Sequence, residues 1–109
     1  MADIDIAREL ALSLPGADEH EHWGRPSFRV RKRIFATLWP DEQHAVLMLS
    51  PDDQAALIAL HPEAFSPVPG GWGARGATSV RLGQVEREEL MDVLETAWRR
   101  VAPKRAKTD

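Results

Sequence analysis

The sequence predicts a two-layer α+β domain in which helices pack on an antiparallel sheet, and three observations lead to this class. Residues 27–31 and 33–39 alternate apolar and polar side chains with the period of two that strands show. Residues 4–14 and 86–101 repeat apolar side chains with the 3.6-residue period of an amphipathic helix. Short turns join neighbouring strand segments, so the strands are expected to pair antiparallel. The predicted order is α-β-β-β-α-β-α.

Local signals mark where the predicted helices begin and end. Asp3 is a good N-cap for the first helix, which ends at Pro15-Gly16 because glycine accepts the positive φ that follows a helix. Ser50 is the expected N-cap of the second helix, with Pro51 at its first position. This helix should stop by His61-Pro62, since the residue before a proline disfavours helical geometry.

The strongest strand pattern is a predicted hairpin over residues 27–39, with Lys32 at its turn. A two-residue turn favours Gly or Asn, so either this turn avoids positive φ or Lys32 is mildly strained. Alternation places Phe28 and Val30 on one face of the first strand and Arg29 and Arg31 on the other. In the second strand, Ile34, Ala36 and Leu38 are expected to share one face, opposite Phe35, Thr37 and Trp39.

The remaining segments complete the predicted order. Residues 40–43 form a turn into an apolar strand over 45–49, and residues 78–82 form a further strand. Residues 65–76 are rich in Gly and Pro and are expected to form a loop. Residues 17–23 stay open, because they lack clear alternation although a short edge strand would tolerate their charges.

Length and composition predict one domain over residues 1–103, followed by a mobile basic tail over 104–109. The absence of cysteine excludes disulfides and Cys-ligated zinc and suits a reducing cytosol. No apolar run approaches the roughly 20 residues of a membrane span, and the acidic start differs from a signal peptide. We therefore expect a soluble, cytoplasmic protein with no membrane role, and a monomer is favoured.

The net charge of −3 conceals a segregation of charge along the chain. Residues 25–33 carry five basic side chains and no acidic one, and residues 99–107 have the same balance. Residues 34–74 carry only acidic charges. Two basic blocks in acidic surroundings point to candidate phosphate-binding elements.

Motifs along nearly the whole chain resemble those of the MmcQ/YjbR family of small bacterial proteins. The matching residues are Leu14-Pro15-Gly16, His22 to Phe28, Val30, Ile34-Phe35-Ala36, Pro67 to Gly70, Trp72-Gly73, Val80 to Leu82 and Val101 to Lys104. The resemblance implies a two-layer α+β fold and DNA binding, through a proposed double-wing arrangement. The sequence departs from the family at Lys32, where the family's hairpin usually has Gly.

The first functional hypothesis is a non-enzymatic DNA-binding protein that contacts phosphates with its basic hairpin, like a wing or β-ribbon. The candidate residues are Arg25, Arg29, Arg31, Lys32 and Arg33, with Arg75 and Arg81 enlarging the patch if they lie near. The competing interpretation is a solvated sheet face whose arginines pair with carboxylates. The sequence pI of about 5.8 favours that interpretation.

The second hypothesis is a module that binds a small anionic ligand or a protein, with no nucleic-acid role. Its groove would combine aromatic area with an arginine, and the candidates are Trp23, Trp39, Trp72, Phe28, Phe35 and Phe65. The competing interpretation is that most of these side chains belong to the core. Trp72 lies in a glycine-rich segment and is expected to be the most exposed.

The sequence gives no catalytic residue and no cofactor site. Gly71-x-Gly73-x-x-Gly76 matches the letters of a dinucleotide fingerprint, but a Pro-rich loop precedes it and a strand follows. His20 and His22 can share a strand face, yet no third histidine is near to complete a metal site. Serines lack a glycine elbow and a local base. We therefore expect no enzyme and no bound metal.

Overall fold

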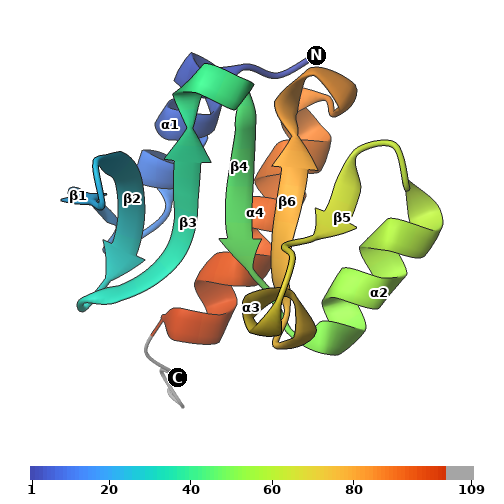
Figure 1. Ribbon diagram of the computed structural model, residues 1–109. Helices are drawn as coiled ribbons and strands as arrows, with labels where there is room; N and C mark the ends of the chain where they lie inside the picture. Colours follow the sequence, from blue (N-terminus) through green and yellow to red (C-terminus); the bar gives the residue numbers. More distant parts are fainter. Residues whose placement is uncertain (103–109) are drawn as a thin grey trace, which may run out of the picture.

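Six strands form one antiparallel sheet in the order β1-β2-β3-β4-β6-β5 (Figure 1). The computed structural model describes residues 1–102. Its strands are β1 Asp18–His22, β2 Arg25–Val30, β3 Arg33–Trp39, β4 His44–Met48, β5 Phe65–Pro67 and β6 Ala77–Arg81. Its helices are α1 Ile4–Ser13, α2 Pro51–Leu60, α3 Gly71–Ala74 and α4 Arg87–Val101, with 3-10 turns η1 Pro40–Glu42 and η2 Leu82–Gln84. The predicted α+β class is confirmed.

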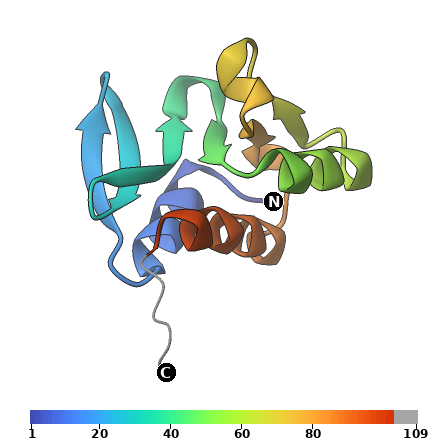
Figure 2. The ribbon, with the colours of Figure 1, turned by 90° about the horizontal axis from the view of Figure 1, so that it is seen from below.

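Helices α1 and α4 lie side by side on one face of the sheet, whereas α2 lies at the β5 end (Figure 2). Two hydrogen bonds hold α4 in place: Arg87 donates to Glu9 of α1 at 2.9 Å, and Trp98 Nε1 donates at 2.8 Å to the carbonyl of Pro15, which follows α1. The core fills the space between this helix layer and the sheet. Its largest fully buried side chains include Phe28, Phe35, Phe65, Leu38, Leu47, Leu90 and Leu94.

The predicted helix starts are confirmed by their capping hydrogen bonds. The Asp3 carboxylate accepts from the Ile6 amide at 2.8 Å, and the Ser50 hydroxyl accepts from the Asp53 amide at 3.0 Å. Both caps satisfy an amide that the first helical turn leaves without a backbone partner. No helix within residues 1–102 has the length and apolar composition that a membrane span requires.

The structure adds detail in the segments that alternation did not resolve. The charged residues 18–22 form the edge strand β1, in which every side chain is exposed. The segment 65–76, predicted as a loop, contains β5 and the short helix α3. The predicted tail over 104–109 lies outside the described residues.

The predicted alternation along β3 is wrong at Ile34 and Phe35. Phe28 pairs with Ala36, but Arg29 pairs with Ile34, so Phe35 is an extra residue that forms a β-bulge. Phe35 and Ala36 are both fully buried in the core. Ile34 consequently lies on the opposite face from Ala36, together with Thr37 and Trp39.

The β2–β3 turn has positive φ, so of the two alternatives for Lys32 the structure shows the strained one. Its two central residues, Arg31 and Lys32, have φ of 51° and 72°. Positive φ at both positions is the requirement of a type I′ turn, which matches the twist of a hairpin and favours Asn-Gly. A side chain at such positions costs roughly 1 kcal/mol, so this basic turn carries strain.

We predict that Lys32→Gly stabilises the domain by about 0.5–1 kcal/mol, because glycine adopts φ of 72° without steric cost. The measurement is urea unfolding. Lys32→Ala is the matched control, since it removes the same charge and keeps the Cβ atom. Equal stabilities of the two variants would contradict strain at this turn.

Candidate binding pocket on the open face of the sheet

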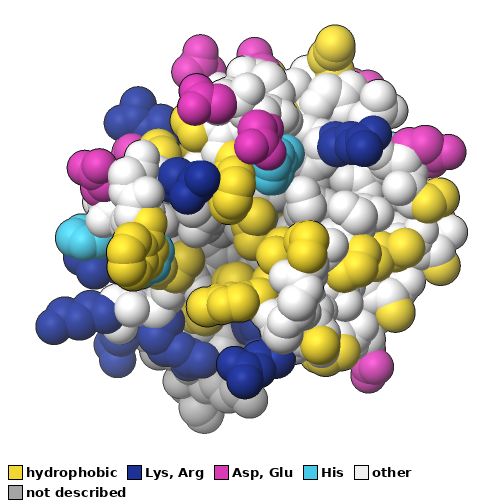
Figure 3. All heavy atoms as spheres, viewed as in Figure 1, with side chains coloured by type: hydrophobic (Ala, Val, Ile, Leu, Met, Phe, Trp, Pro, Cys, Tyr) yellow, Lys and Arg dark blue, Asp and Glu magenta, His cyan; other side chains and the backbone are white. Residues whose placement is uncertain are grey.

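The sheet face opposite α1 and α4 is hollowed into a pocket of about 410 Å³. The β1–β2 hairpin and α3 rise from this face on its two sides (Figure 2). Hydrophobic side chains surround the hollow in the space-filling view (Figure 3). The lining residues are His22, Trp23, Arg25, Ile34, Thr37, Trp39, Val46, Met48, Val68, Trp72 and Ala77.

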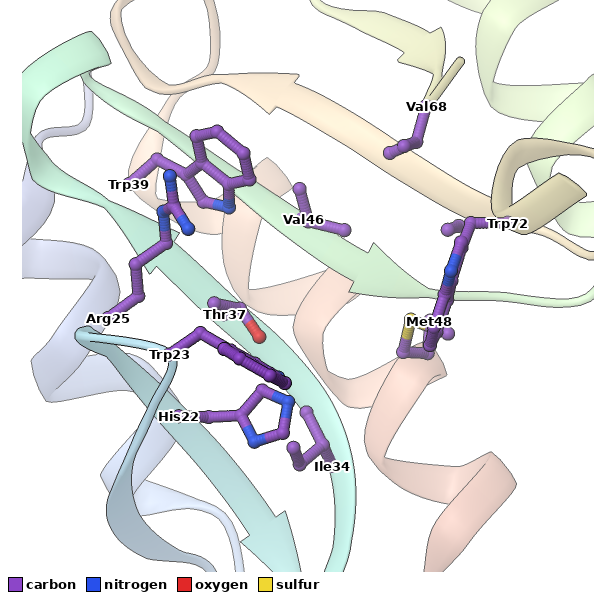
Figure 4. A pocket seen from close by; sticks show the side chains of 11 residues that line it. His22, Trp23, Arg25, Ile34, Thr37, Trp39, Val46, Met48, Val68 and Trp72 are labelled. Atoms are coloured by element: carbon purple, nitrogen blue, oxygen red, sulfur yellow. The ribbon is translucent and has the colours of Figure 1, made fainter. Parts of the chain in front are cut away.

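Three of the four tryptophans converge on this pocket from separate segments (Figure 4). Trp23 occupies the β1–β2 turn with φ of 57° and is 85% exposed, and Trp72 in α3 is 64% exposed. Trp39 lies on β3 at the end of the pocket where Arg25 stacks on it, and it is half-buried. Large aromatic side chains left exposed around a hollow are typical of a binding surface. The fourth, Trp98, joins α4 to Pro15 and is structural.

The predicted phenylalanine contribution to this groove is wrong. Phe28, Phe35 and Phe65 are all fully buried and belong to the core. The core faces the helix layer, so these rings lie on the other side of the sheet from the pocket. Trp23, with its greater exposure, also replaces Trp72 as the most exposed of the predicted aromatic residues.

Arg25 supplies the cationic group within the pocket. Its guanidinium carbon lies 3.6 Å from the centroid of the Trp39 ring, and Trp39 stacks in turn on His44 with ring centroids 5.1 Å apart. No carboxylate within residues 1–102 forms an ion pair with Arg25. Stacking occupies the face of the guanidinium and leaves its in-plane N–H groups free to donate to an anion.

The pocket floor is apolar apart from the hydroxyl of Thr37. Ser27 on β2 and Thr37 on β3 are cross-strand partners, and their side-chain oxygens lie 3.3 Å apart. Ser27 is fully buried, whereas Thr37 lines the pocket. The Thr37 hydroxyl therefore gives the floor a donor or acceptor that a ligand can reach.

Gln54 fixes the wall that carries Trp72. This α2 side chain is buried, and its Nε2 donates to the carbonyls of Gly73 and Ala77, both at 3.0 Å. Gly73 also packs closely, since a Cβ atom there would lie 1.7 Å from the Val68 carbonyl oxygen. Helix α3 is thereby held between α2, β6 and the preceding loop.

The predicted basic residues lie in four separate places. Arg25 lies in the pocket, and Arg29 pairs with Asp18 across β1 and β2 at 2.9 Å. Arg81 pairs in register with His44, which pairs with Trp39 at the end of β3. Arg81 therefore lies at the opposite end of the sheet from the β2–β3 turn.

The other basic residues gather at one end of the sheet, which we call the basic edge. Exposed side chains contribute to it from the β2–β3 turn, from the end of α3 and from the last turn of α4: Arg31, Lys32, Arg33, Arg75 and Arg100. Arg100 is placed by its donation to the Met48 carbonyl at 3.2 Å. Figure 3 shows several Lys and Arg side chains along the lower margin of this face, while its upper part carries Asp and Glu together with other Lys and Arg side chains.

Sequence reasoning missed the apolar lining of the pocket. Val46 and Met48 face it from β4, while Ala45, Leu47 and Leu49 are buried on the core side. The uninterrupted apolar run over 45–49 was the available signal, because a strand that is apolar on both faces is expected to be covered on both.

The two histidines of the β1 strand lie on one face, as expected of alternate residues. His20 pairs in register with Ser27, and His22 with Arg25. In the part of the chain that the structure describes, no group of three or more His, Asp or Glu side chains is placed to hold a metal ion.

The sequence matches a known protein family, and the fold matches a solved structure. A family model described as YjbR matches residues 12–100. The crystal structure of Deinococcus radiodurans protein DR2400, with family-model domain DUF419, aligns with a TM-score of 0.73 and 21% sequence identity over 89% of this chain and 76% of that chain. No curated protein matches the sequence. At this identity, the likeness to the solved structure is one of fold alone.

Proposed function

Since this chain belongs to the YjbR family, as its motifs predicted, we propose that it is a non-enzymatic binding domain whose ligand occupies the pocket on the open face of the sheet. The observation that carries the proposal is the convergence of Trp23, Trp39 and Trp72 around Arg25. The pocket volume of about 410 Å³ falls within the range of roughly 300–1,000 Å³ typical of small-molecule sites.

The lining selects for a ligand with a flat ring and a negative charge. Trp23 and Trp72 offer ring faces, on which a planar group can stack. Arg25 offers N–H donors to an anionic group or to a carbonyl oxygen of the ring, and Thr37 offers a hydroxyl. Among the described residues, neither Asp nor Glu lines this pocket, while Asp41 and Glu42 line the adjoining hollow on the other side of Arg25 and Trp39.

We predict that anilinonaphthalene sulfonate, an anion with a planar naphthalene ring, binds the folded domain, and that Trp72→Ala weakens this binding about tenfold. Loss of one stacked ring weakens the binding free energy by roughly 1–1.5 kcal/mol, which corresponds to about a tenfold loss of affinity. Leu60→Ala is the matched control, because Leu60 is 78% exposed on α2 and lies outside the pocket. The measurement is a fluorescence titration of each variant, with urea unfolding to verify the fold. Absence of binding at millimolar concentration would refute the pocket as a ligand site.

DNA binding through the basic hairpin is the second candidate function. The β2–β3 turn favours it, because Arg31, Lys32 and Arg33 are exposed and form no ion pair with any carboxylate within residues 1–102. Three adjacent cations on a protruding turn can contact successive phosphates. The Arg29–Asp18 ion pair and the net charge of −3 weaken this candidate relative to the pocket.

We predict that replacing Arg31, Lys32 and Arg33 together by Gln weakens duplex DNA binding at low salt at least tenfold. The slope of log K against log salt should fall in magnitude by about 3, one for each phosphate that the variant no longer neutralises. The matched control replaces Arg8, Arg81 and Arg87 by Gln, which removes the same charge away from the basic edge. Equal reductions of affinity in the two triple variants would assign binding to net charge and not to the hairpin.

A further inference from the structure

We infer that the pocket and the basic edge form one site, whose ligand is an unpaired nucleotide with its base in the pocket and its phosphates on the basic edge. The inference rests on the proposed function of the pocket and names the class of ligand. It assigns the pocket and the basic edge to one ligand.

The first step is continuity between the two surfaces. Ile34 and Met48 line the pocket at the end away from Trp39. Arg33 directly precedes Ile34 in β3, and Arg100 donates to the Met48 carbonyl. Cations from two separate elements therefore lie at this end of the sheet, where Arg33, the partner of the core residue Val30, leaves β3 on the face opposite to the pocket.

The second step is the geometry of the pocket walls. Trp23 and Trp72 enter from opposite sides and lie over the floor formed by β3 and β4 (Figure 4). Both side chains are largely exposed, so their ring faces are accessible. Stacking of a base on an aromatic side chain contributes roughly 1–3 kcal/mol and tolerates any base, because every base has a flat face.

The third step is the distribution of polar groups. The Thr37 hydroxyl and the Arg25 guanidinium face the pocket, where they can bond the edge of a base. Asp41 and Glu42 lie beside Trp39, at the other end of the pocket from the basic edge, so phosphates are favoured at the basic edge. A ligand with a neutral ring in the pocket and phosphates on the basic edge matches this distribution of carboxylates.

The fourth step excludes paired bases as occupants of the pocket. In a duplex the base faces are stacked on one another, so a tryptophan inside a concave pocket cannot reach them. A base that stacks on Trp23 or Trp72 must be unpaired. A free nucleotide and a single strand both offer an unpaired base and a phosphate, so either could be the ligand. Because the basic edge holds several cations, it matches a strand with several phosphates.

Isothermal titration calorimetry at low salt tests this inference with four unlabelled probes. They are an oligothymidylate of about 12 nucleotides, an abasic deoxyribose-phosphate strand of equal length, a duplex of equal length, and thymidine monophosphate. We expect the oligothymidylate to bind at least tenfold more tightly than the abasic strand or the duplex. Equal affinities for the oligothymidylate and the abasic strand would overturn the inference, because charge alone would then explain binding.

Two variants and one control separate the contributions of ring and charge. Trp72→Ala should lower the affinity for oligothymidylate about tenfold and leave the abasic strand unaffected, while Leu60→Ala changes neither. The Gln triple variant at positions 31–33 should weaken both strands. Thymidine monophosphate binding as tightly as the strand would support the free nucleotide as the source. If anilinonaphthalene sulfonate binds and none of the four probes does, the inference fails and the proposed pocket function stands; if neither binds, both fail.

Discussion

Replacing Gly76 by alanine should destabilise the domain by about 3 kcal/mol, and the reason is the close approach of β4 to the end of α3. Gly76 has φ of 114°, a conformation that side chains rarely adopt. A Cβ atom there would lie 1.8 Å from the Leu49 carbonyl oxygen. The same glycine accepts hydrogen bonds through its carbonyl from the Leu49 amide at 3.2 Å and from the Thr78 hydroxyl at 2.8 Å. Relief of the clash therefore also breaks these bonds.

Gly83→Ala provides the matched control for this variant. A Cβ atom at Gly83 would meet no heavy atom within 4 Å, and its φ is not positive. The control should therefore change stability by no more than about 1 kcal/mol. The measurement is urea unfolding of the two variants and the parent. A destabilisation below about 1 kcal/mol for Gly76→Ala would show that the backbone relaxes around the added carbon.

The glycines that resemble a dinucleotide fingerprint thus have a structural role. Gly73 allows α3 to pack against the Val68 backbone, and Gly76 allows the chain to pass from α3 into β6 beside the end of β4. Together they hold Trp72 at the edge of the pocket. The context of the motif, with a loop before it and a strand after it, already indicated that phosphate binding was not its purpose.

Those parts of the fold that depend on local signals could be predicted from the sequence. The caps at Asp3 and Ser50 act within one helical turn, and the alternation of residues 27–30 is a property of one strand. The bulge at Phe35 could not be predicted in this way. It is defined by pairing between β2 and β3, and it moves Ile34 from the core to the pocket.

The candidate site was predictable in its residue types and not in its arrangement. Trp23, Trp39 and Trp72 were identified as aromatic candidates, but only the pairing of strands shows that they share a pocket with Arg25. Arg29, in contrast, was a predicted site residue that the fold pairs with a carboxylate. Its sequence neighbourhood is basic, yet the cross-strand register with β1 places Asp18 beside it. Long-range pairing therefore decides which basic residues stay free to bind a ligand.

Replacing Gln54 by leucine should weaken anilinonaphthalene sulfonate binding several-fold and destabilise the domain by about 2 kcal/mol. The variant lacks two hydrogen bonds, to Gly73 and Ala77, each contributing roughly 1 kcal/mol. Each carbonyl keeps one backbone donor, so we expect α3 to loosen without unfolding of the sheet. Hydrogen exchange should then accelerate in residues 70–77, and Gln84→Leu, at an exposed glutamine, should leave it unchanged. If binding is abolished while exchange in this segment stays slow, Gln54 does not act through the position of Trp72.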